Sequence, residues 1–324
     1  MRSIAILTLK LAGATAAFAL LFHFVHIDPV LSALSAANTL LVCLGVLVFL
    51  SGQVVAAARW RKILQNDGVD IPLKRTLRMN LIGTFAGNFL PGMATGDLTK
   101  SALLFRDYPM QRSFLIASVV YDRIFGLAAI FILMIIGTLL LGAMRGEWGF
   151  ARYAIMGGLL FLLSMWLIAS DISYARILHI LPKMLVKRIS VFMGELQKLL
   201  RASTLRWRTL AFSLVFQLSW AVSQWIMLCA LSANAPFVPV LTASTFSLVV
   251  ALLPISLNGL GLREGTFSYV LQHLGVDPQI AVAATLLSLL PILVSSLIGG
   301  MLLGWGSRYG KVRATGSLED GRRL

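Results

Sequence analysis

The hydrophobic residues of this chain gather in long, nearly uninterrupted runs separated by short polar segments. A run of about 20 apolar residues is long enough to cross the hydrocarbon core of a bilayer as a helix. The pattern predicts an all-α integral membrane protein with six spanning helices. They are expected at about residues 5–26, 38–58, 112–144, 150–170, 208–231 and 278–304.

Two further apolar segments, at about residues 77–106 and 238–273, are interrupted at their centres. Each holds a Leu-Pro step, then a glycine five residues after the proline and a basic residue nine residues after it. The matching residues are Pro91, Gly96 and Lys100 in the first segment and Pro254, Gly259 and Arg263 in the second. Proline and glycine end helices, and lipid offers no partner to the freed backbone groups. We therefore expect each break to be enclosed by protein or to face a watery cavity.

The basic residues predict how the chain is threaded, because cytoplasmic loops carry an excess of Lys and Arg. Suppose that each broken segment is a re-entrant hairpin, which leaves the membrane on the side where it entered, the first from the cytoplasm and the second from outside. Almost every Lys and Arg then lies on or near the cytoplasmic side, and the exceptions are Arg123, Arg145, Arg152 and Arg263. Both termini are then cytoplasmic. Residues 5–144 and 150–304 form an inverted-topology repeat, a layout found in many transporters. The alternatives are that the segments span fully, or that the shared Leu-Pro-Gly spacing arose by chance.

The remaining segments complete one transmembrane domain, residues 1–306. Residues 171–207 carry apolar residues three or four positions apart with Lys and Arg between them, which predicts an amphipathic surface helix interrupted near Pro182. Residues 27–38 contain no Lys or Arg and are interpreted as a loop. Residues 307–324 are polar and basic and are predicted to be a disordered cytoplasmic tail. Arg2 and the apolar run after it also suit a cleaved signal peptide, but Lys10 interrupts that run.

Composition agrees with a membrane protein and excludes other classes. Hydrophobic residues make up 58% of the 324 residues, and only 13% are charged. A soluble domain has roughly 45–50% apolar and 25% charged residues. The formal net charge is +15, and the basic residues lie mostly between the apolar runs. This distribution indicates contact with anionic lipid rather than nucleic acid. Cys43 and Cys229 lie within apolar runs and are interpreted as buried packing residues.

The breaks suggest an anion site between the two segments. A helix that restarts after a break presents unpaired N–H groups and the positive end of its dipole, and both favour a phosphate. Lys100 and Arg263 add formal positive charge beside those groups. Structural turns between packed helices are the alternative. The candidate site residues are Asn88, Pro91, Gly96, Asp97, Lys100, Asp122, Arg123, Pro254, Asn258, Gly259, Arg263 and Glu264.

The acidic and amide residues of this set have several interpretations. Asp97 is expected to cap a helix that begins near Leu98, and Glu264 to neutralise a neighbouring helix. Both acids need partners within the bilayer, and the candidates are Lys100, Arg123 and Arg263. Asp122 and Arg123 lie ten residues into a span, where they are either a snorkelling interfacial pair or a group that holds the charges of the broken segments. Gln217, Ser223 and Gln224 are expected to form hydrogen bonds between helices, and the alternative is that they line a polar path.

The sequence contains no set of His, Cys, Asp and Glu at metal-ligand spacing, no Walker loop and no GxSxG motif. We therefore expect no metal, no cofactor and no nucleotide-driven pump, and we favour a protein that is not an enzyme.

The stretches NFLPGMATGDLTKSALLFR, YDRIFGL and LLPISLNGLGLREGTF resemble the lysylphosphatidylglycerol synthase transmembrane region, the flippase-like domain family. The resemblance covers about residues 5–305. It implies a lipid-binding membrane domain that in some members is fused to an aminoacyl-lipid synthase. The synthase domain is absent from this sequence, so its aminoacyl-transfer activity is not implied.

The leading expectation is a lipid translocase of the bacterial inner membrane that binds a phosphate-bearing head group, of an anionic phospholipid or a polyprenyl phosphate. The alternatives are an integral-membrane transferase acting on a lipid-linked phosphate, with Asp97 or Glu264 as general base, and an accessory subunit of a lipid-pathway enzyme. The possible protein partners are further copies of this chain, in a homo-oligomer, or a lipid-synthesis enzyme. The sequence leaves the lipid, the direction and the coupling of transport open.

Overall fold

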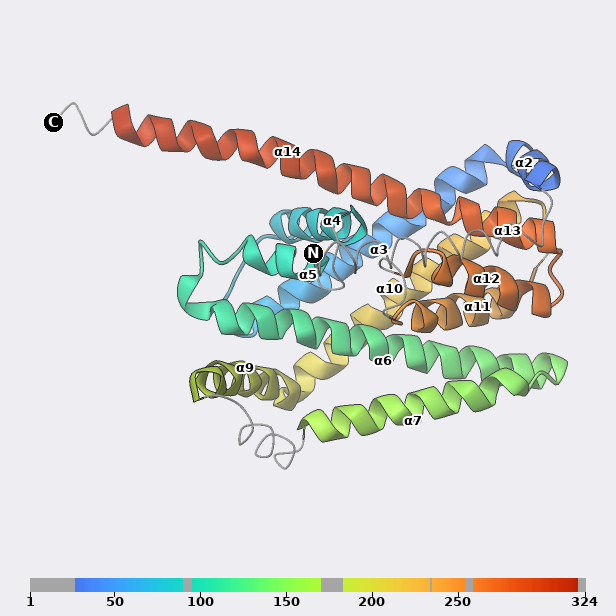
Figure 1. The fold of residues 1–324 in the computed structure, drawn as a ribbon, viewed down its shortest axis with the longest axis horizontal. Helices are drawn as coiled ribbons and strands as arrows, with labels where there is room; N and C mark the ends of the chain where they lie inside the picture. The colour runs from blue at the N-terminus through green and yellow to red at the C-terminus, as the bar shows by residue number, and fades with distance from the viewer. Residues whose placement is uncertain (1–26, 90–94, 170–182, 234, 254–258, 320–324) are drawn as a thin grey trace, which may run out of the picture.

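The computed structural model describes residues 27–89, 95–169, 183–233, 235–253 and 259–319, and all regular structure within them is helical (Figure 1). In chain order the elements are α2 (Ile27–Ser35), α3 (Thr39–Gln65), α4 (Leu73–Phe89), α5 (Thr95–Ala102), the 3-10 turn η1 (Pro109–Gln111), α6 (Arg112–Arg145), α7 (Gly149–Ala169), α9 (Lys183–Arg201), α10 (Ser203–Ala230), α11 (Phe237–Val250), α12 (Leu262–His273), α13 (Pro278–Leu287) and α14 (Leu289–Glu319).

Four stretches of the described chain are long and apolar enough to cross a membrane. They are Thr39–Gln65, Pro109–Arg145, Ser203–Ala230 and Pro278–Gly304. They correspond to the second, third, fifth and sixth predicted spans, so the prediction of a multi-pass helical membrane protein is confirmed. The first predicted span, residues 5–26, lies outside the described residues. The fourth is α7, whose apolar part, Gly149–Met165, is shorter than the other four.

Local sequence sets where several of these helices begin and end. The side chain of Asn38 accepts hydrogen bonds from the amides of Leu40 and Leu41, which caps α3. Gly146 ends α6 with a φ of 73°, a conformation that favours glycine. The sixth predicted span is divided at Ser288, between α13 and α14. Pro291 has no amide hydrogen to donate to residue 287, which explains the interruption.

Two expectations about polar segments were wrong. Residues 27–35, interpreted as a loop, form α2, and Val30 of this helix is buried against the helices around it. Residues 307–319, predicted to be disordered, continue α14 without a break. This stretch contains no proline, and its Lys, Arg and Ala residues support a helix. Residues 320–324 lie outside the described part.

The two broken segments form two antiparallel helix pairs, α4 with α5 and α11 with α12. Each pair starts and finishes at the same end of the molecule. Arg75, at the start of α4, forms an ion pair with Asp107 after α5. Ala235 before α11 and Gly275 after α12 line one surface hollow. The first pair lies where α6 begins and the second where α6 ends, on opposite ends of the molecule (Figure 1).

Glycines allow the close approach within the first pair. A Cβ atom added to Gly83 would lie 2.8 Å from the carbonyl oxygen of Gly96, so α4 and α5 touch through their backbones. Gly83 and Gly87 are four residues apart, the small-residue spacing that brings helices together in membranes. In the second pair, Gly259 and Gly261 have φ values of 78° and 83°, which confirms that glycine supplies left-handed backbone at this break.

The long helices pack in a reciprocal pattern. Helix α3 packs along α10, and these two carry the chain into the first and second pair respectively. Helix α14, which follows the second pair, packs on α4 of the first pair. Helix α6, which follows the first pair, packs on α11 of the second pair. Each half of the chain therefore covers the helix pair of the other half (Figure 1).

Two apolar clusters lie at the two ends, and the polar site described below lies between them. One cluster is built around Phe267 and Leu271 and includes residues of α2, α10, α11 and α13. The other surrounds Trp60 and Tyr121 and includes Leu196 and Leu199 of α9. Burying such side chains contributes about 1.5–3 kcal/mol each when the alternative is water. Inside a membrane the close packing itself carries more of the stability.

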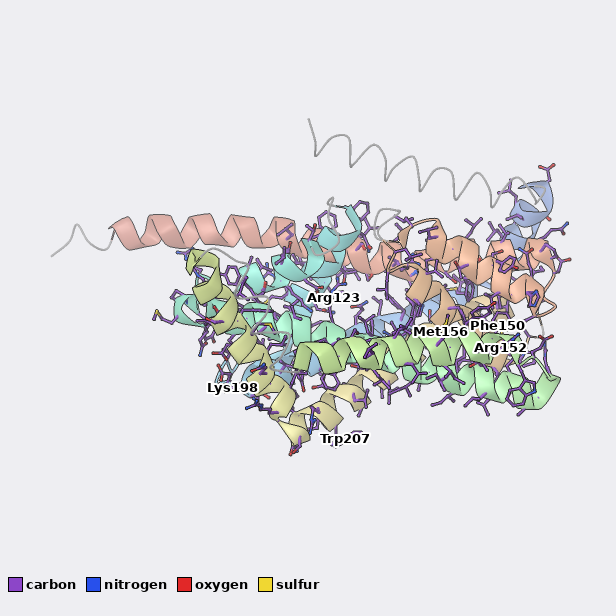
Figure 2. The ribbon with its side chains drawn as sticks, turned by 60° about the horizontal axis from the view of Figure 1, so that its bottom comes forward. Arg123, Phe150, Arg152, Met156, Lys198 and Trp207 are labelled. Carbon is purple, nitrogen blue, oxygen red and sulfur yellow. The ribbon has the colours of Figure 1, made fainter. Side chains whose placement is uncertain are left out.

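Helix α9 confirms the amphipathic pattern where the structure describes it, whereas residues 170–182 lie outside. Leu196 and Leu199 are buried against α6, and Lys198 on the opposite face forms an ion pair with Asp67. The hydrogen bond to the Asp67 carboxylate raises the pKa of Lys198 above its usual value. Figure 2 shows Lys198 towards one end of the molecule and Phe150 and Arg152, at the start of α7, towards the other.

The packing of α14 on α4 leads to a prediction about Gly299. A Cβ atom at this position would clash with the backbone carbonyl of Leu81, whereas a Cβ atom at Gly304 of the same helix would meet no atom within 4 Å. We expect Gly299→Ala to destabilise the protein by about 1–3 kcal/mol. Gly304→Ala is the matched control and should be neutral or stabilising by up to about 1 kcal/mol, because alanine favours the helix. Thermal unfolding in detergent measures both, and equal melting temperatures would contradict the packing described here.

Candidate functional site

A cavity of about 390 Å³ lies between the two helix pairs, and we call it the central cavity. The first pair contributes Thr84, Asp97 and Lys100 to its walls, and the second contributes Gly259 and Arg263. Helices α3, α6 and α10 close the remaining sides. The sequence predicted a site between the broken segments, and the structure places a polar cavity there.

A somewhat larger hollow of about 440 Å³ lies along α7. Apart from Arg152 its walls are apolar, and Met156 and Leu159 there are exposed. Figure 2 labels Arg152 and Met156 along α7. Exposed aliphatic residues on a membrane helix face lipid, so this hollow offers no chemistry comparable to that of the central cavity.

Lys100 is held between two carboxylates. Its ammonium lies 3.3 Å from Asp97 and 3.2 Å from Asp122, and it lies 5.1 Å from the centre of the Trp60 ring. Only 5% of Lys100 is exposed. A buried ammonium needs such partners, because its loss of water is costly. The lysine is therefore a fixed point of positive charge in the wall of the cavity.

Arg59 is the second buried cation, and the sequence analysis missed it. Its guanidinium donates two hydrogen bonds to Asp122, at 2.6 and 3.0 Å, and a third to the hydroxyl of Ser213, at 2.8 Å. The span predicted from the sequence ends at residue 58 and therefore leaves Arg59 outside the membrane helix. Helix α3 continues to Gln65. Gln53, Ala56 and Arg59 recur every three residues and share the cavity face, a signal that a longer predicted helix would have revealed.

Asp122 and Arg123 have different partners, because consecutive residues of a helix point in different directions. Asp122 is 4% exposed and binds Arg59 and Lys100, so it is not a snorkelling interfacial residue. Arg123 forms an ion pair with Asp97, and 54% of its side chain is exposed. The two residues thus contact the charges of the first broken segment, as one of our two interpretations proposed.

Asp97 does not lie ahead of helix α5, as the helix cap we expected would. Helix α5 begins at Thr95 rather than near Leu98, so Asp97 lies within its first turn and not ahead of it. A carboxylate there still stabilises the helix through the dipole. Its side-chain partners are Arg123 and Lys100, so the expectation that Asp97 pairs with a basic residue describes its contacts.

The second pair places Arg263 and Glu264 at the start of α12. Glu264 accepts a hydrogen bond of 2.7 Å from the amide of Gly261, which caps the helix, and it forms an ion pair with Arg263. The Arg263 guanidinium lies 5.7 Å from the centre of the Trp220 ring. This arrangement resembles that of the first pair. In both, the basic residue of the break lies against a tryptophan of the preceding long helix, Trp60 of α3 or Trp220 of α10.

Of the other predicted site residues, Asn88, Gly96 and Gly259 lie in the described part of the chain and three more lie outside it. Asn88 donates a hydrogen bond of 2.8 Å to Ser296 of α14, and Gly96 packs against α4. Gly259 lines the central cavity. Pro91, Pro254 and Asn258 lie outside the described residues, so the tips of the two breaks are not placed. The expected polar contacts between helices are present, with Ser223 bonded to Gly45 and Gln224 to Ser244, while Gln217 lines the cavity.

The charges around the cavity do not cancel. The basic residues are Arg59, Lys100, Arg123 and Arg263, and the acidic residues are Asp97, Asp122 and Glu264. Each arginine forms an ion pair with one carboxylate, and Lys100 is shared between two of these carboxylates. Within the described residues the cluster carries one formal positive charge in excess. Surplus charge in a low-dielectric site favours the binding of an anion.

The described residues contain no group of three or more His, Cys, Asp or Glu side chains placed to hold a metal ion. The chemistry available in the cavity is that of ammonium, guanidinium, carboxylate, amide and hydroxyl groups. Such a set can bind a phosphate and the polar groups attached to it.

These features define a multi-pass helical membrane protein with a cationic cavity between two broken helix pairs. The family described as the lysylphosphatidylglycerol synthase TM region matches residues 6–300, and the chain belongs to that family. The chain is also similar to the UPF0104 membrane protein PH1989 of Pyrococcus horikoshii. The two are 20% identical over 309 residues, which cover 88% of this chain and 92% of that protein.

Proposed function

We propose that this protein is a lipid translocase, and that it binds the phosphate of a lipid head group in the central cavity. The observation that carries the proposal is the surplus positive charge of Lys100, held in a cavity whose walls come from both broken helix pairs. A phosphate oxygen is the most abundant anionic group in a membrane. The acyl or prenyl chains of the lipid would remain in the bilayer while the head group enters the cavity.

The helix arrangement supports a transport role. Each pair starts and finishes at one end of the molecule, as a re-entrant hairpin does, and the two pairs occupy opposite ends. The reciprocal packing of α14 on α4 and of α6 on α11 is the pattern that an inverted repeat produces. In transporters built this way, one repeat moves against the other and exposes a site near the midplane to each side in turn.

The proposal includes an orientation and a location. Helix α9 and the start of α4, which carries Lys74 and Arg75, lie at the end where the first pair enters, and the positive-inside rule assigns this basic end to the cytoplasm. Both termini then lie in the cytoplasm of a bacterial cell with the protein in its inner membrane. Anionic phospholipid or a polyprenyl phosphate is the proposed partner.

Transport by the purified protein tests this function. The protein is reconstituted into vesicles of phosphatidylcholine and phosphatidylglycerol that contain acyl-labelled fluorescent phosphatidylglycerol, and dithionite quenches the label that reaches the outer leaflet. We expect quenching to exceed the outer-leaflet fraction seen in protein-free vesicles. A fluorescent glucosylceramide, which has no phosphate, is the matched control lipid and should not cross. Movement of neither lipid, or equal movement of both, would contradict a phosphate-dependent route.

The transferase alternative needs a carboxylate available as a general base. Asp97 and Glu264, the two candidates, both form ion pairs, and Glu264 also caps α12. The geometry therefore favours transport over transfer. Product formation from a polyprenyl phosphate and a sugar donor by the purified protein would reverse this ranking. A stoichiometric protein partner together with no transport would support an accessory role.

A further inference from the structure

A second hollow of about 190 Å³ adjoins the central cavity, and we call it the α4 hollow. It lies among α4, α5 and α6. Gly83, Gly87, Asn88 and Gly96 line the α4 hollow alone, whereas both spaces share Asn80, Thr84, Asp97, Lys100 and Arg123. The two spaces are therefore neighbours with a common wall.

The α4 hollow is polar although it lies beside a helix of the first broken pair. Asn80, Thr84 and Asn88 recur every fourth residue of α4 and form a stripe of amide and hydroxyl groups along one face. Thr84 and Asn88 lie further along the helix towards its break. Asn80 donates a hydrogen bond to Gln53 and Asn88 donates one to Ser296, and both residues still line the hollow. Polar groups in a membrane helix need such partners or a polar path. The glycines of α4 and α5 leave room beside this stripe, because they carry no side chains.

The Arg123–Asp97 ion pair lies in the wall that the two spaces share, together with Lys100, which also pairs with Asp97. The Arg123 side chain is 54% exposed, whereas Asp97 and its other partner Lys100 are largely buried. A guanidinium binds a carboxylate and a phosphate with the same pair of hydrogen bonds. Arg123 can therefore release Asp97 and donate hydrogen bonds to a phosphate oxygen without losing a charged partner, and Lys100 continues to neutralise Asp97.

From this arrangement we propose that the α4 hollow is a second binding site for the lipid head group, separated from the central cavity by the Arg123–Asp97 pair. The inference rests on the proposed lipid transport and extends it. The phosphate binds in the central cavity, Arg123 exchanges Asp97 for a phosphate oxygen, and the head group passes along the polar stripe of α4. No covalent bond forms or breaks in this exchange.

Single cysteines distinguish the two sites. In a variant with Cys43→Ala and Cys229→Ala, Gly87→Cys places a thiol in the α4 hollow and Gly126→Cys places one in the central cavity. Both positions accept a Cβ atom at ordinary contact distance, 3.6 Å from the Gly96 Cα atom and 3.9 Å from the Arg59 Nη1 atom. Gly194→Cys in α9, where a Cβ atom meets nothing within 4 Å, is the control. Each thiol is modified with a methanethiosulfonate ethylsulfonate reagent, and mass spectrometry measures the extent of modification before reconstitution.

We expect modification of Gly87→Cys to slow the movement of fluorescent phosphatidylglycerol by at least about tenfold. The amount of phosphatidylglycerol that the protein retains in detergent should not change, because the central cavity stays open. Modification of Gly126→Cys should abolish both retention and movement, and modification of Gly194→Cys should change neither. If Gly87→Cys does not fold, Gly87→Ala is used instead and should slow movement without altering retention.

Three results would overturn the second site while leaving the proposed function in place. They are unchanged movement after complete modification of Gly87→Cys, loss of retention together with movement in that variant, and failure of the reagent to reach its thiol in the folded protein. If the unsubstituted protein neither retains nor moves phosphatidylglycerol, the proposed function itself fails, and the second site fails with it.

Discussion

Replacing both Lys100 and Arg263 by alanine is expected to slow the movement of phosphatidylglycerol by at least about 100-fold. Each side chain places a positive charge in the wall of the central cavity, one from each helix pair. A hydrogen bond to a charged group contributes about 1.5–3 kcal/mol, so losing two of them removes at least about 3 kcal/mol of head-group binding. The vesicle assay with fluorescent phosphatidylglycerol measures the effect.

The matched control for this variant keeps the charges. Lys100→Arg with Arg263→Lys should retain most of the transport, since a cation remains at each position, although the exchange alters hydrogen-bond geometry. Helix content and thermal unfolding must be compared for both double variants, because Lys100 also binds Asp97 and Asp122. Full transport by a folded Lys100→Ala/Arg263→Ala protein would exclude these residues from the site.

Asp122→Ala is expected to lower the free energy of unfolding by about 3–5 kcal/mol, because removing one partner leaves buried charge without compensation. Asp122 is the only carboxylate among the described residues that forms an ion pair with Arg59, and it also binds Lys100. All three side chains are buried. Without the carboxylate, Arg59 keeps its hydrogen bond to Ser213 but no acidic partner in the described part of the chain. Unfolding of the purified protein in detergent measures the loss.

Asp70→Ala provides the comparison for Asp122→Ala. Asp70 lies 3.5 Å from Arg61 in a pair whose Asp side chain is 75% exposed. Exposed pairs contribute no more than about 1 kcal/mol, so this substitution should have little effect. The double variant Arg59→Met/Asp122→Leu should recover part of the stability lost in Asp122→Ala, because apolar side chains often replace a buried ion pair without loss. Equal stabilities of Asp122→Ala and Asp70→Ala would show that the buried cluster does not hold the helices together.

The order of the helices could be predicted from the sequence because apolar runs and breaks are local signals. The run at residues 112–144 became α6, and the two broken segments became the helix pairs α4–α5 and α11–α12. The matched spacing of Lys100 and Arg263 predicts a common site, and both residues line the central cavity. These features depend on residues close together in the chain, so periodicity and proline or glycine positions reveal them.

The partners of the charged residues could not be predicted, because they depend on helices far apart in the sequence. Arg59 binds Asp122, which lies 63 positions away, and Ser213, which lies 154 positions away. The predicted span ends at residue 58, so Arg59 is not predicted to face the site, whereas α3 continues to Gln65. Helix ends inferred from hydropathy are uncertain by several residues. The close approach of Gly299 to Leu81 likewise joins α14 to α4 and has no local signature.

Head-group binding in the central cavity can be tested by electron cryomicroscopy of the protein in nanodiscs of phosphatidylglycerol, with a bound antibody fragment. We expect head-group density in the central cavity, with phosphate oxygens within hydrogen-bond distance of the Lys100 ammonium or the Arg263 guanidinium. A cavity without lipid density, with ordered phospholipid only on the outer surfaces of the helices, would contradict it.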